Sequence, residues 1–271
     1  MNLVLQGPST TRSLLQDRFK DLYEVAPHAF KVPGQQRDRR IEAWCEDNHV
    51  DFAWMEEGRK FSDLKLVAMD MDSTLITIEC IDEIGDFCGK KAEIAAITEQ
   101  AMRGELDYPQ SLRKRVSLLE GLPEDSLLRV YEDRLRFTPG AEQLVAACKR
   151  NGVKLLLVSG GFTYFTDRLK ARLGLDYTIS NTLEVRGGKL TGQLVGDIVD
   201  ADAKARKFLS VMQALGATRM QTVAMGDGAN DLRMMKQAGL SVAFRAKPVV
   251  RAQADCALNW SGLDAVVNLF E

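Results

Sequence analysis

The 271-residue sequence lacks several features that mark common classes of protein. Its five cysteines are odd in number, scattered and never spaced as C-x-x-C, which fits neither a disulfide framework nor a cysteine zinc site. An excess of positive charge is also missing, since 36 Lys and Arg stand against 38 Asp and Glu. This balance argues against a nucleic-acid binder driven by positive charge.

Long apolar runs are absent as well. No stretch approaches the roughly 20 residues needed to cross a bilayer. The N-terminal segment MNLVLQGPST has neither the basic flank nor the long apolar stretch of a signal peptide. We therefore expect a soluble, globular, cytoplasmic protein with no membrane partner. Hydrophobic residues make up 45% of the chain, which is enough for a sizeable core at this length.

A change in composition at residues 56–63, EEGRKFSD, suggests a boundary between two parts of the chain. Ahead of it, residues 1–63 show the apolar patterns of short strands and helices in the order βαβαβ. The predicted strands are NLVLQ, HAFKV and DFAWM. This small α/β segment carries no recognised motif. A regulatory role, or a role in forming a homodimer, is a hypothesis that rests only on the separate pattern.

From residue 64 onward, short apolar runs recur without polar alternation, which is typical of strands buried on both faces of a parallel sheet. The runs are LKLVAMD, VKLLLVSG, QTVAMGD and LSVAF. Helical patterns lie between them, so residues 64–271 are predicted to form an open, doubly wound, mostly parallel α/β sheet of the Rossmann-like type. In such a sheet, ligands bind beyond the carboxyl ends of the strands.

Two stretches interrupt this alternation. Residues 76–136 contain only helix-like segments, so the core is divided into residues 64–75 and 137–271. The helical insertion is a candidate lid over the site, and its two crossings to the core would allow a hinge. Further on, Gly187 and Gly188 separate two strand-like segments and predict a hairpin.

Polar clusters follow three of the predicted strands. DMDST contains Asp70 and Asp72, SGGF begins at Ser159, and GDGAND occupies residues 226–231. Each cluster alone could be an ordinary strand-end turn. Independent turns, however, would not need to occupy the same end of successive strands in one sheet. The combination therefore predicts one shared site.

The charged residues at this predicted site indicate that it binds a metal ion and a phosphate. Asp70, Asp72 and Asp227 would offer the hard oxygen ligands that Mg²⁺ prefers. Lys204 falls near the start of the helix before the third strand. A single lysine is usually solvated surface. Beside a magnesium-carboxylate site, its ammonium would offset the charge of a phosphate.

In this order, DMDST, the strand end at Ser159, Lys204 and GDGAND resemble the four motifs of the haloacid dehalogenase superfamily of phosphatases. The helical insertion is similar to the type 1 cap of that superfamily. Within it, DMDSTL followed by Glu79, SLRKRVSLLEGL, VSGGF and MGDGAND are similar to the phosphoserine phosphatases. The resemblance spans residues 64–271 and leaves out residues 1–63.

The resemblance implies an enzyme and a reaction. The reaction is the Mg²⁺-dependent hydrolysis of O-phospho-L-serine to L-serine and phosphate, the last step of serine biosynthesis. Asp70 would be the nucleophile that forms an aspartyl-phosphate, and Asp72 the general acid and base. Asp70, the backbone carbonyl of Asp72 and Asp227 would hold Mg²⁺.

The resemblance also assigns residues to the phosphoryl group. The hydroxyl of Ser159, the amide of Gly160 and Lys204 would stabilise the phosphoryl oxygens. Asn230 and Asp231 would complete the loop, with Asp231 orienting Lys204 or a metal-bound water.

A further set of residues would recognise the amino acid. By position alone, Glu79 is an exposed helix-start residue and Arg115 a partner in a surface salt bridge. In the resemblance, they hold the ammonium and the carboxylate of the substrate. Met102 and Tyr108 would wall the pocket.

Other functions stay open at this point. An aspartyl-phosphate also permits transfer to another hydroxyl compound, so the protein could be a phosphotransferase or a broader small-molecule phosphomonoesterase. A module that binds or regulates without turnover is disfavoured, because none of the expected catalytic positions is substituted.

Overall fold

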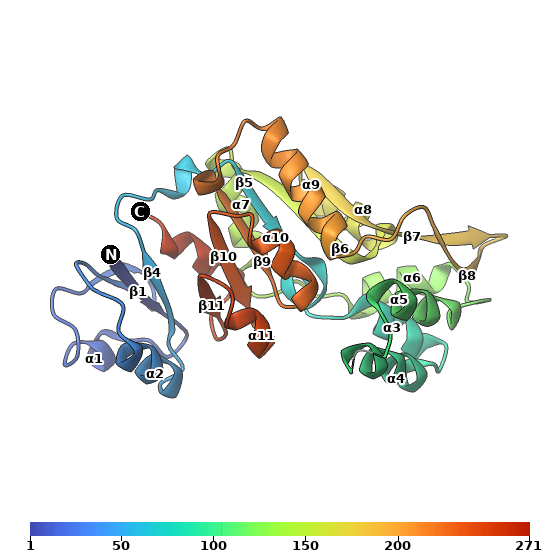
Figure 1. Ribbon diagram of the computed structural model, residues 1–271, viewed down its shortest axis with the longest axis horizontal. Coiled ribbons are helices and arrows are strands. Elements are labelled where there is room, and N and C mark those ends of the chain that lie inside the picture. The colour runs from blue at the N-terminus through green and yellow to red at the C-terminus, as the bar shows by residue number, and fades with distance from the viewer. Residues whose placement is uncertain (104) are drawn as a thin grey trace.

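The computed structural model describes residues 1–103 and 105–271 of the chain. A small sheet lies at one end of the molecule, a large sheet occupies the centre, and a group of helices lies at the other end (Figure 1). No helix in the described ranges is long and apolar enough to span a membrane.

The N-terminal sheet is antiparallel in all of its described pairings. Its strands are β1 (Asn2–Gln6), β2 (Tyr23–Ala26), β3 (Ala29–Val32) and β4 (Asp51–Met55), in the order β2-β3-β1-β4, with α1 (Arg12–Leu15) and α2 (Arg39–Asp47) packed against it. The three predicted strands are confirmed as β1, β3 and β4. The predicted βαβαβ order is wrong, because β2 was missed. This strand has four residues whose side chains are mostly exposed, so no buried apolar run marks it in the sequence.

The central sheet has the order β11-β10-β9-β5-β6-β7-β8. Its strands are β5 (Leu66–Met69), β6 (Lys154–Phe162), β7 (Tyr177–Arg186), β8 (Lys189–Val195), β9 (Thr222–Gly226), β10 (Leu240–Phe244) and β11 (Cys256–Leu258). Every pairing from β11 to β7 is parallel. The predicted α/β class is therefore confirmed, and strands such as β5 are buried along their whole length.

Helices cover both faces of the central sheet. They are α7 (Ala141–Arg150), α8 (Thr163–Leu173), α9 (Ala201–Ala214), α10 (Leu232–Met235) and α11 (Pro248–Arg251). Buried side chains of α7 and α8 share one apolar cluster with Val67 and Met69 of β5. Those of α9 and α10 share another with Leu66 and Ala68. Alternate residues of one strand thus face opposite layers, as the side-chain period of a strand requires.

Between β5 and β6 the chain forms α3 (Cys80–Phe87), α4 (Lys91–Met102), α5 (Tyr108–Ser117) and α6 (Asp125–Arg129). These helices lie at the end of the molecule opposite the N-terminal sheet (Figure 1). The two crossings to the core run side by side, since Ile76 and Phe137 form an antiparallel bridge. The N–H of Thr138 also donates to the carbonyl of Leu75 at 3.0 Å.

The hairpin predicted at Gly187 and Gly188 is confirmed as β7 and β8, and both glycines have positive φ, at 57° and 73°. The hairpin also reaches the inserted helices. The N–H of Gly121 donates to the carbonyl of Leu190, and the N–H of Leu190 donates to the carbonyl of Leu122, both at 2.9 Å. The insertion therefore has a third attachment to the core, which would restrain any lid movement about the two crossings.

The N-terminal sheet is fastened to the central sheet by buried polar groups. Asp51 of β4 is 1% exposed. Its carboxylate accepts hydrogen bonds from the backbone N–H groups of Asn259, Trp260 and Ser261, at 2.7, 3.2 and 2.8 Å. The ammonium of Lys31 donates to the carbonyl of Phe270 at 2.6 Å. These bonds fix the segment that follows β11 against β4.

We expect Asp51→Ala to lower the free energy of unfolding by about 3 kcal/mol, because three N–H groups lose a charged acceptor. Urea unfolding measures the change. Asp47→Ala, at an exposed position of α2, is the control and should stay within about 0.5 kcal/mol of the native chain. Equal stabilities of the two variants would contradict this account of the interface.

Candidate active site

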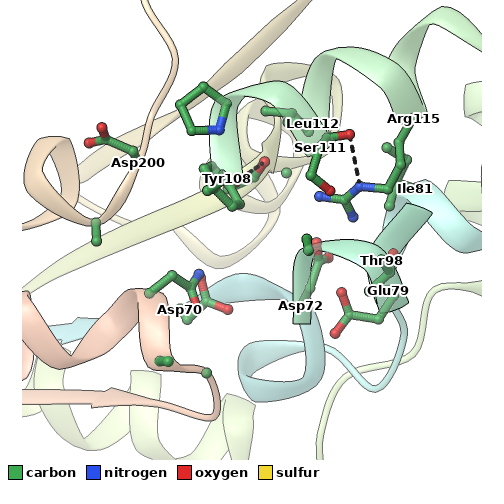
Figure 2. A pocket seen from close by; sticks show the side chains of 18 of the residues that line it. Asp70, Asp72, Glu79, Ile81, Thr98, Tyr108, Ser111, Leu112, Arg115 and Asp200 are labelled. Carbon is green, nitrogen blue, oxygen red and sulfur yellow. Dashed lines mark hydrogen bonds between the residues drawn. The ribbon is translucent and has the colours of Figure 1, made fainter. Parts of the chain in front are cut away.

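A cavity of about 670 Å³ lies between the carboxyl edge of the central sheet and helices α3 to α5 (Figure 2). Its lining includes many residues of the predicted site: Asp70, Asp72, Glu79, Tyr108, Arg115, Gly160, Asp227 and Asn230. Ser159, Lys204 and Asp231 are buried and are not among these lining residues. The parallel order β9-β5-β6 brings the three sequence clusters to one edge, as predicted.

A buried lysine joins two of the carboxylates. Lys204 of α9 is 1% exposed, and its Nζ donates to Oδ1 of Asp70 at 2.5 Å and to Oδ1 of Asp231 at 2.8 Å. Burial alone would lower the pKa of Lys204, but Asp231 and Asp70 raise it above its ordinary value. Burial raises the pKa of Asp70, and the ammonium of Lys204 opposes this rise. The lysine is therefore the group that favours the ionised form of Asp70.

Three carboxylates form a group that could hold a metal ion. One oxygen each from Asp70, Asp227 and Asp231 lies within 4.8 Å of the other two. Burial raises the pKa of Asp227 to about 6, and the charge of Asp231 adds to the effect. Such a crowded set of oxygens suits a hard divalent cation. We predicted a supporting role for Asp231. The other predicted ligand, the backbone carbonyl of Asp72, is not tested by this group of side-chain oxygens.

Asp72 lies in an irregular turn, Met71–Leu75, that carries the chain away from β5. Ser73 in this turn has a positive φ of 55°. Oδ1 of Asp72 accepts a hydrogen bond from the N–H of Cys80 at 3.4 Å. Burial and the nearby charge of Glu79 raise the pKa of Asp72 to about 8. Without a bound metal, this carboxyl is thus mostly protonated at neutral pH, as a general acid must be.

The SGGF cluster is the carboxyl end of β6, where the pairing with β7 is interrupted by a bulge. Oγ of Ser159, whose residue is 1% exposed, accepts a hydrogen bond from the N–H of Gly161 at 2.8 Å. A Cβ on Gly160 would collide with the hydroxyl of Tyr108 from α5. One on Gly161 would lie 3.1 Å from Oδ2 of Asp72. Both glycines are needed because other parts of the site approach the backbone closely.

The residues expected to recognise the amino acid lie on the helical side of the cavity. Figure 2 shows the guanidinium of Arg115 pointing from α5 toward the side where Glu79 and Asp72 lie. Nε of Arg115 donates to the carbonyl of Ser111 at 3.4 Å. Glu79 accepts a hydrogen bond from the hydroxyl of Ser73 at 2.6 Å. A cation and an anion therefore face the same cavity from neighbouring helices.

Two further predictions concern the pocket wall. The hydroxyl of Tyr108 donates to the carbonyl of Gly160 at 3.4 Å, and burial raises the pKa of this tyrosine to about 12. Met102 ends α4, but its side chain lies outside the described part of the chain. The cavity is also lined by Lys247 and Asp200, which the sequence reasoning missed. Asp200 forms a pair with Asp202 close to Lys204, and this spacing could have drawn attention to it, whereas Lys247 has no such signal in the sequence.

Comparison with known proteins agrees with this geometry. The model of the haloacid dehalogenase-like hydrolase family matches residues 67–236. A phosphoserine phosphatase from Polaromonas sp. is 58% identical over 215 residues, which cover 78% of this chain and 91% of the relative. The chain belongs to the phosphoserine phosphatase family. It is therefore a hydrolase of the haloacid dehalogenase superfamily.

Solved structures of the family extend the likeness. A probable phosphoserine phosphatase from Vibrio cholerae, in unliganded form, has a TM-score of 0.86 and 41% identity, covering 99% of this chain and 86% of that one. A phospho-aspartyl intermediate analogue of phosphoserine phosphatase has a TM-score of 0.72 and 40% identity, covering 77% of this chain and 99% of that one. The first of these similarities includes the N-terminal sheet.

In this member of the family, Glu79→Gln should lower the pKa of Asp72 below about 8, because one negative charge that disfavours ionisation is removed. Carbon-13 NMR titration of the aspartate carboxyls in metal-free protein measures the shift. Glu93→Gln, at an exposed position of α4, serves as the control. An unchanged pKa in Glu79→Gln would show that burial alone sets the value.

Proposed function

We propose that this protein hydrolyses O-phospho-L-serine to L-serine and phosphate, with Mg²⁺ as cofactor and Asp70 as nucleophile. The observation that carries the proposal is the contact of Asp70 with the buried ammonium of Lys204, inside a group of three carboxylates. Membership of the phosphoserine phosphatase family supports the substrate. The reaction ends serine biosynthesis, and a cytoplasmic location remains the expectation.

In the first step, a carboxylate oxygen of Asp70 attacks phosphorus, and the bond from phosphorus to the serine oxygen breaks. Asp72 gives its proton to the departing oxygen, so L-serine leaves as an alcohol. The products of this step are an aspartyl-phosphate and the carboxylate of Asp72. Burial and the charge of Glu79 raise the pKa of Asp72, which favours the protonated form that this role requires.

In the second step, Asp72 takes a proton from water, and the resulting hydroxide attacks phosphorus. The bond between phosphorus and Asp70 breaks, which releases phosphate and restores both carboxyl groups. Throughout, the hydroxyl of Ser159 and the ammonium of Lys204 would bind oxygens of the phosphoryl group. Mg²⁺ held by Asp70, Asp227 and Asp231 would supply positive charge against the developing negative charge.

Selectivity would come from the helical side of the cavity. Arg115 would bind the carboxylate of phosphoserine through two parallel hydrogen bonds, and Glu79 would bind its ammonium. The residues at the sheet edge would contact only the phosphoryl group, so they would not distinguish one phosphate ester from another. Phosphotransfer to a second hydroxyl compound is the alternative, and phosphorylated product formed with homoserine present would reveal it.

Chelation of divalent cations should abolish turnover, and Asp227→Ala should reduce it by at least about 100-fold by removing a ligand. Titration with Mg²⁺ should show that the variant needs far more metal. Asp167→Ala, at an exposed position of α8, should leave the metal requirement unchanged. Ca²⁺ should inhibit because its coordination shell is larger and looser. Full activity in excess chelator would overturn the metal assignment.

Arg115→Ala should lose far more turnover of O-phosphoserine than of p-nitrophenyl phosphate. The expected difference corresponds to about 2 to 5 kcal/mol, since a substrate carboxylate would be left without its partner. Arg113→Ala removes an exposed arginine from the same helix and should change neither rate. Equal losses on both substrates would show that Arg115 supports the structure or the chemistry, and would reduce the proposal to a general small-molecule phosphatase.

A further inference from the structure

Residues 159–161 form a bulge in the pairing of β6 with β7. Val158 pairs with Ile179. The next pair is Phe162 with Asn181, so β6 advances by four residues while β7 advances by two. The surplus of β6 projects toward the cavity, where Gly160 and Gly161 form part of the lining. A bulge of this kind deprives backbone groups of their ladder partners.

The side chain of Asn181 supplies partners for this bulge. The residue is 1% exposed. Its Nδ2 donates to the carbonyl oxygen of Gly160 at 2.7 Å and approaches that of Gly161 at 3.4 Å. The carbonyl of Gly160 also receives the hydroxyl of Tyr108 at 3.4 Å. Of these two donors, the amide of Asn181 is the closer, and it belongs to β7 of the central sheet.

The other end of the same side chain holds a different part of the site. Oδ1 of Asn181 accepts a hydrogen bond from the N–H of Val199 at 2.8 Å. Val199 directly precedes Asp200, the N-cap of α9, and this helix carries Lys204. One buried amide therefore connects the bulge on β6 to the start of the helix that provides the catalytic ammonium.

The orientation of Ser159 follows from the first of these bonds. The peptide between Gly160 and Gly161 accepts a hydrogen bond at its carbonyl from Asn181, and its N–H donates to Oγ of Ser159 at 2.8 Å. Hydrogen bonds at both ends of one peptide reinforce each other. Because Oγ of Ser159 accepts there, its own hydrogen stays available to donate to another oxygen.

We propose that Asn181 is a positioning residue for phosphoryl transfer. Asn181 orients the peptide between Gly160 and Gly161, and this peptide in turn orients the hydroxyl of Ser159. Asn181 also fixes the bulge relative to Lys204. The inference rests on the phosphatase function proposed above. The inferred role concerns only the binding of the phosphoryl group, because the hydrogen bonds of Asn181 do not extend to Glu79 or Arg115.

The test compares Asn181→Asp with the native protein. The substitution keeps the size of the side chain and the acceptor for Val199 but replaces the donor with a carboxylate oxygen that repels the carbonyl of Gly160. Hydrolysis of phosphoserine by the native protein is measured first, and its absence would refute the proposed function rather than this inference. Inhibition constants are then measured for orthovanadate, which mimics the phosphoryl group in transfer, and for L-serine.

We expect kcat to fall by about 10- to 100-fold and inhibition by orthovanadate to weaken by a similar factor. Inhibition by L-serine should stay within about twofold. The two inhibition constants do not depend on the fraction of folded protein, so they separate a positioning role from a loss of fold. Asn181→Ser keeps a donor too short to reach both partners, and it should show the same pattern if Asn181→Asp does not fold.

Ser180→Ala is the matched control, since the neighbouring hydroxyl bonds to Thr166 at 2.7 Å on the other face of β7. This variant should keep both inhibition constants. Unchanged inhibition by orthovanadate in the Asn181 variants, or equal weakening for orthovanadate and L-serine, would overturn the proposal.

Discussion

The ammonium of Lys204 lies between two buried carboxylates, and the arrangement of the site depends on this contact. Asp70 directly follows β5, Asp231 follows β9, and Lys204 comes from α9. The ion pairs therefore join two strands of the central sheet to one of its covering helices. Two carboxylates at this depth without a cation would repel each other and lose hydration. Removing one partner of a buried ion pair commonly costs about 3 to 5 kcal/mol. The same cation opposes the rise in the pKa of Asp70 that burial causes, and so favours the ionised form that a nucleophile requires.

The central sheet and the inserted helices carry different parts of the chemistry. The carboxyl edge of the sheet provides the charged and hydroxyl groups that face a phosphoryl group, while α3 and α5 provide Glu79 and Arg115. Strand β7 connects the two. Asn181 of β7 bonds to the bulge that contains Ser159. The same strand continues into the hairpin with β8, which bonds to Gly121 and Leu122 of the helical insertion. Movement of the inserted helices would therefore displace a strand that also supports the phosphoryl site.

The features predicted from sequence are those that leave a local signal. Buried runs such as LVAM identify the parallel strands, and polar clusters at their ends identify the edge where the site lies. Strand β2 was missed because it is only four residues long and its side chains are mostly exposed, so no buried apolar run marks it. Asp51 and Asn181 were missed for another reason. Each is a single polar residue in a strand, and its role depends on hydrogen bonds to backbone groups distant in the sequence. No spacing of residues in the sequence reveals those partners.

Direct capture of the covalent intermediate tests the account most simply. Native protein mixed with O-phosphoserine and Mg²⁺ is quenched within one turnover and reduced with borohydride, which converts an aspartyl-phosphate to homoserine. Peptide mass spectrometry then locates the changed residue. The account predicts that Asp70 alone is converted, and only when substrate is present. Turnover with no converted residue, or conversion of Asp72 in place of Asp70, would contradict it.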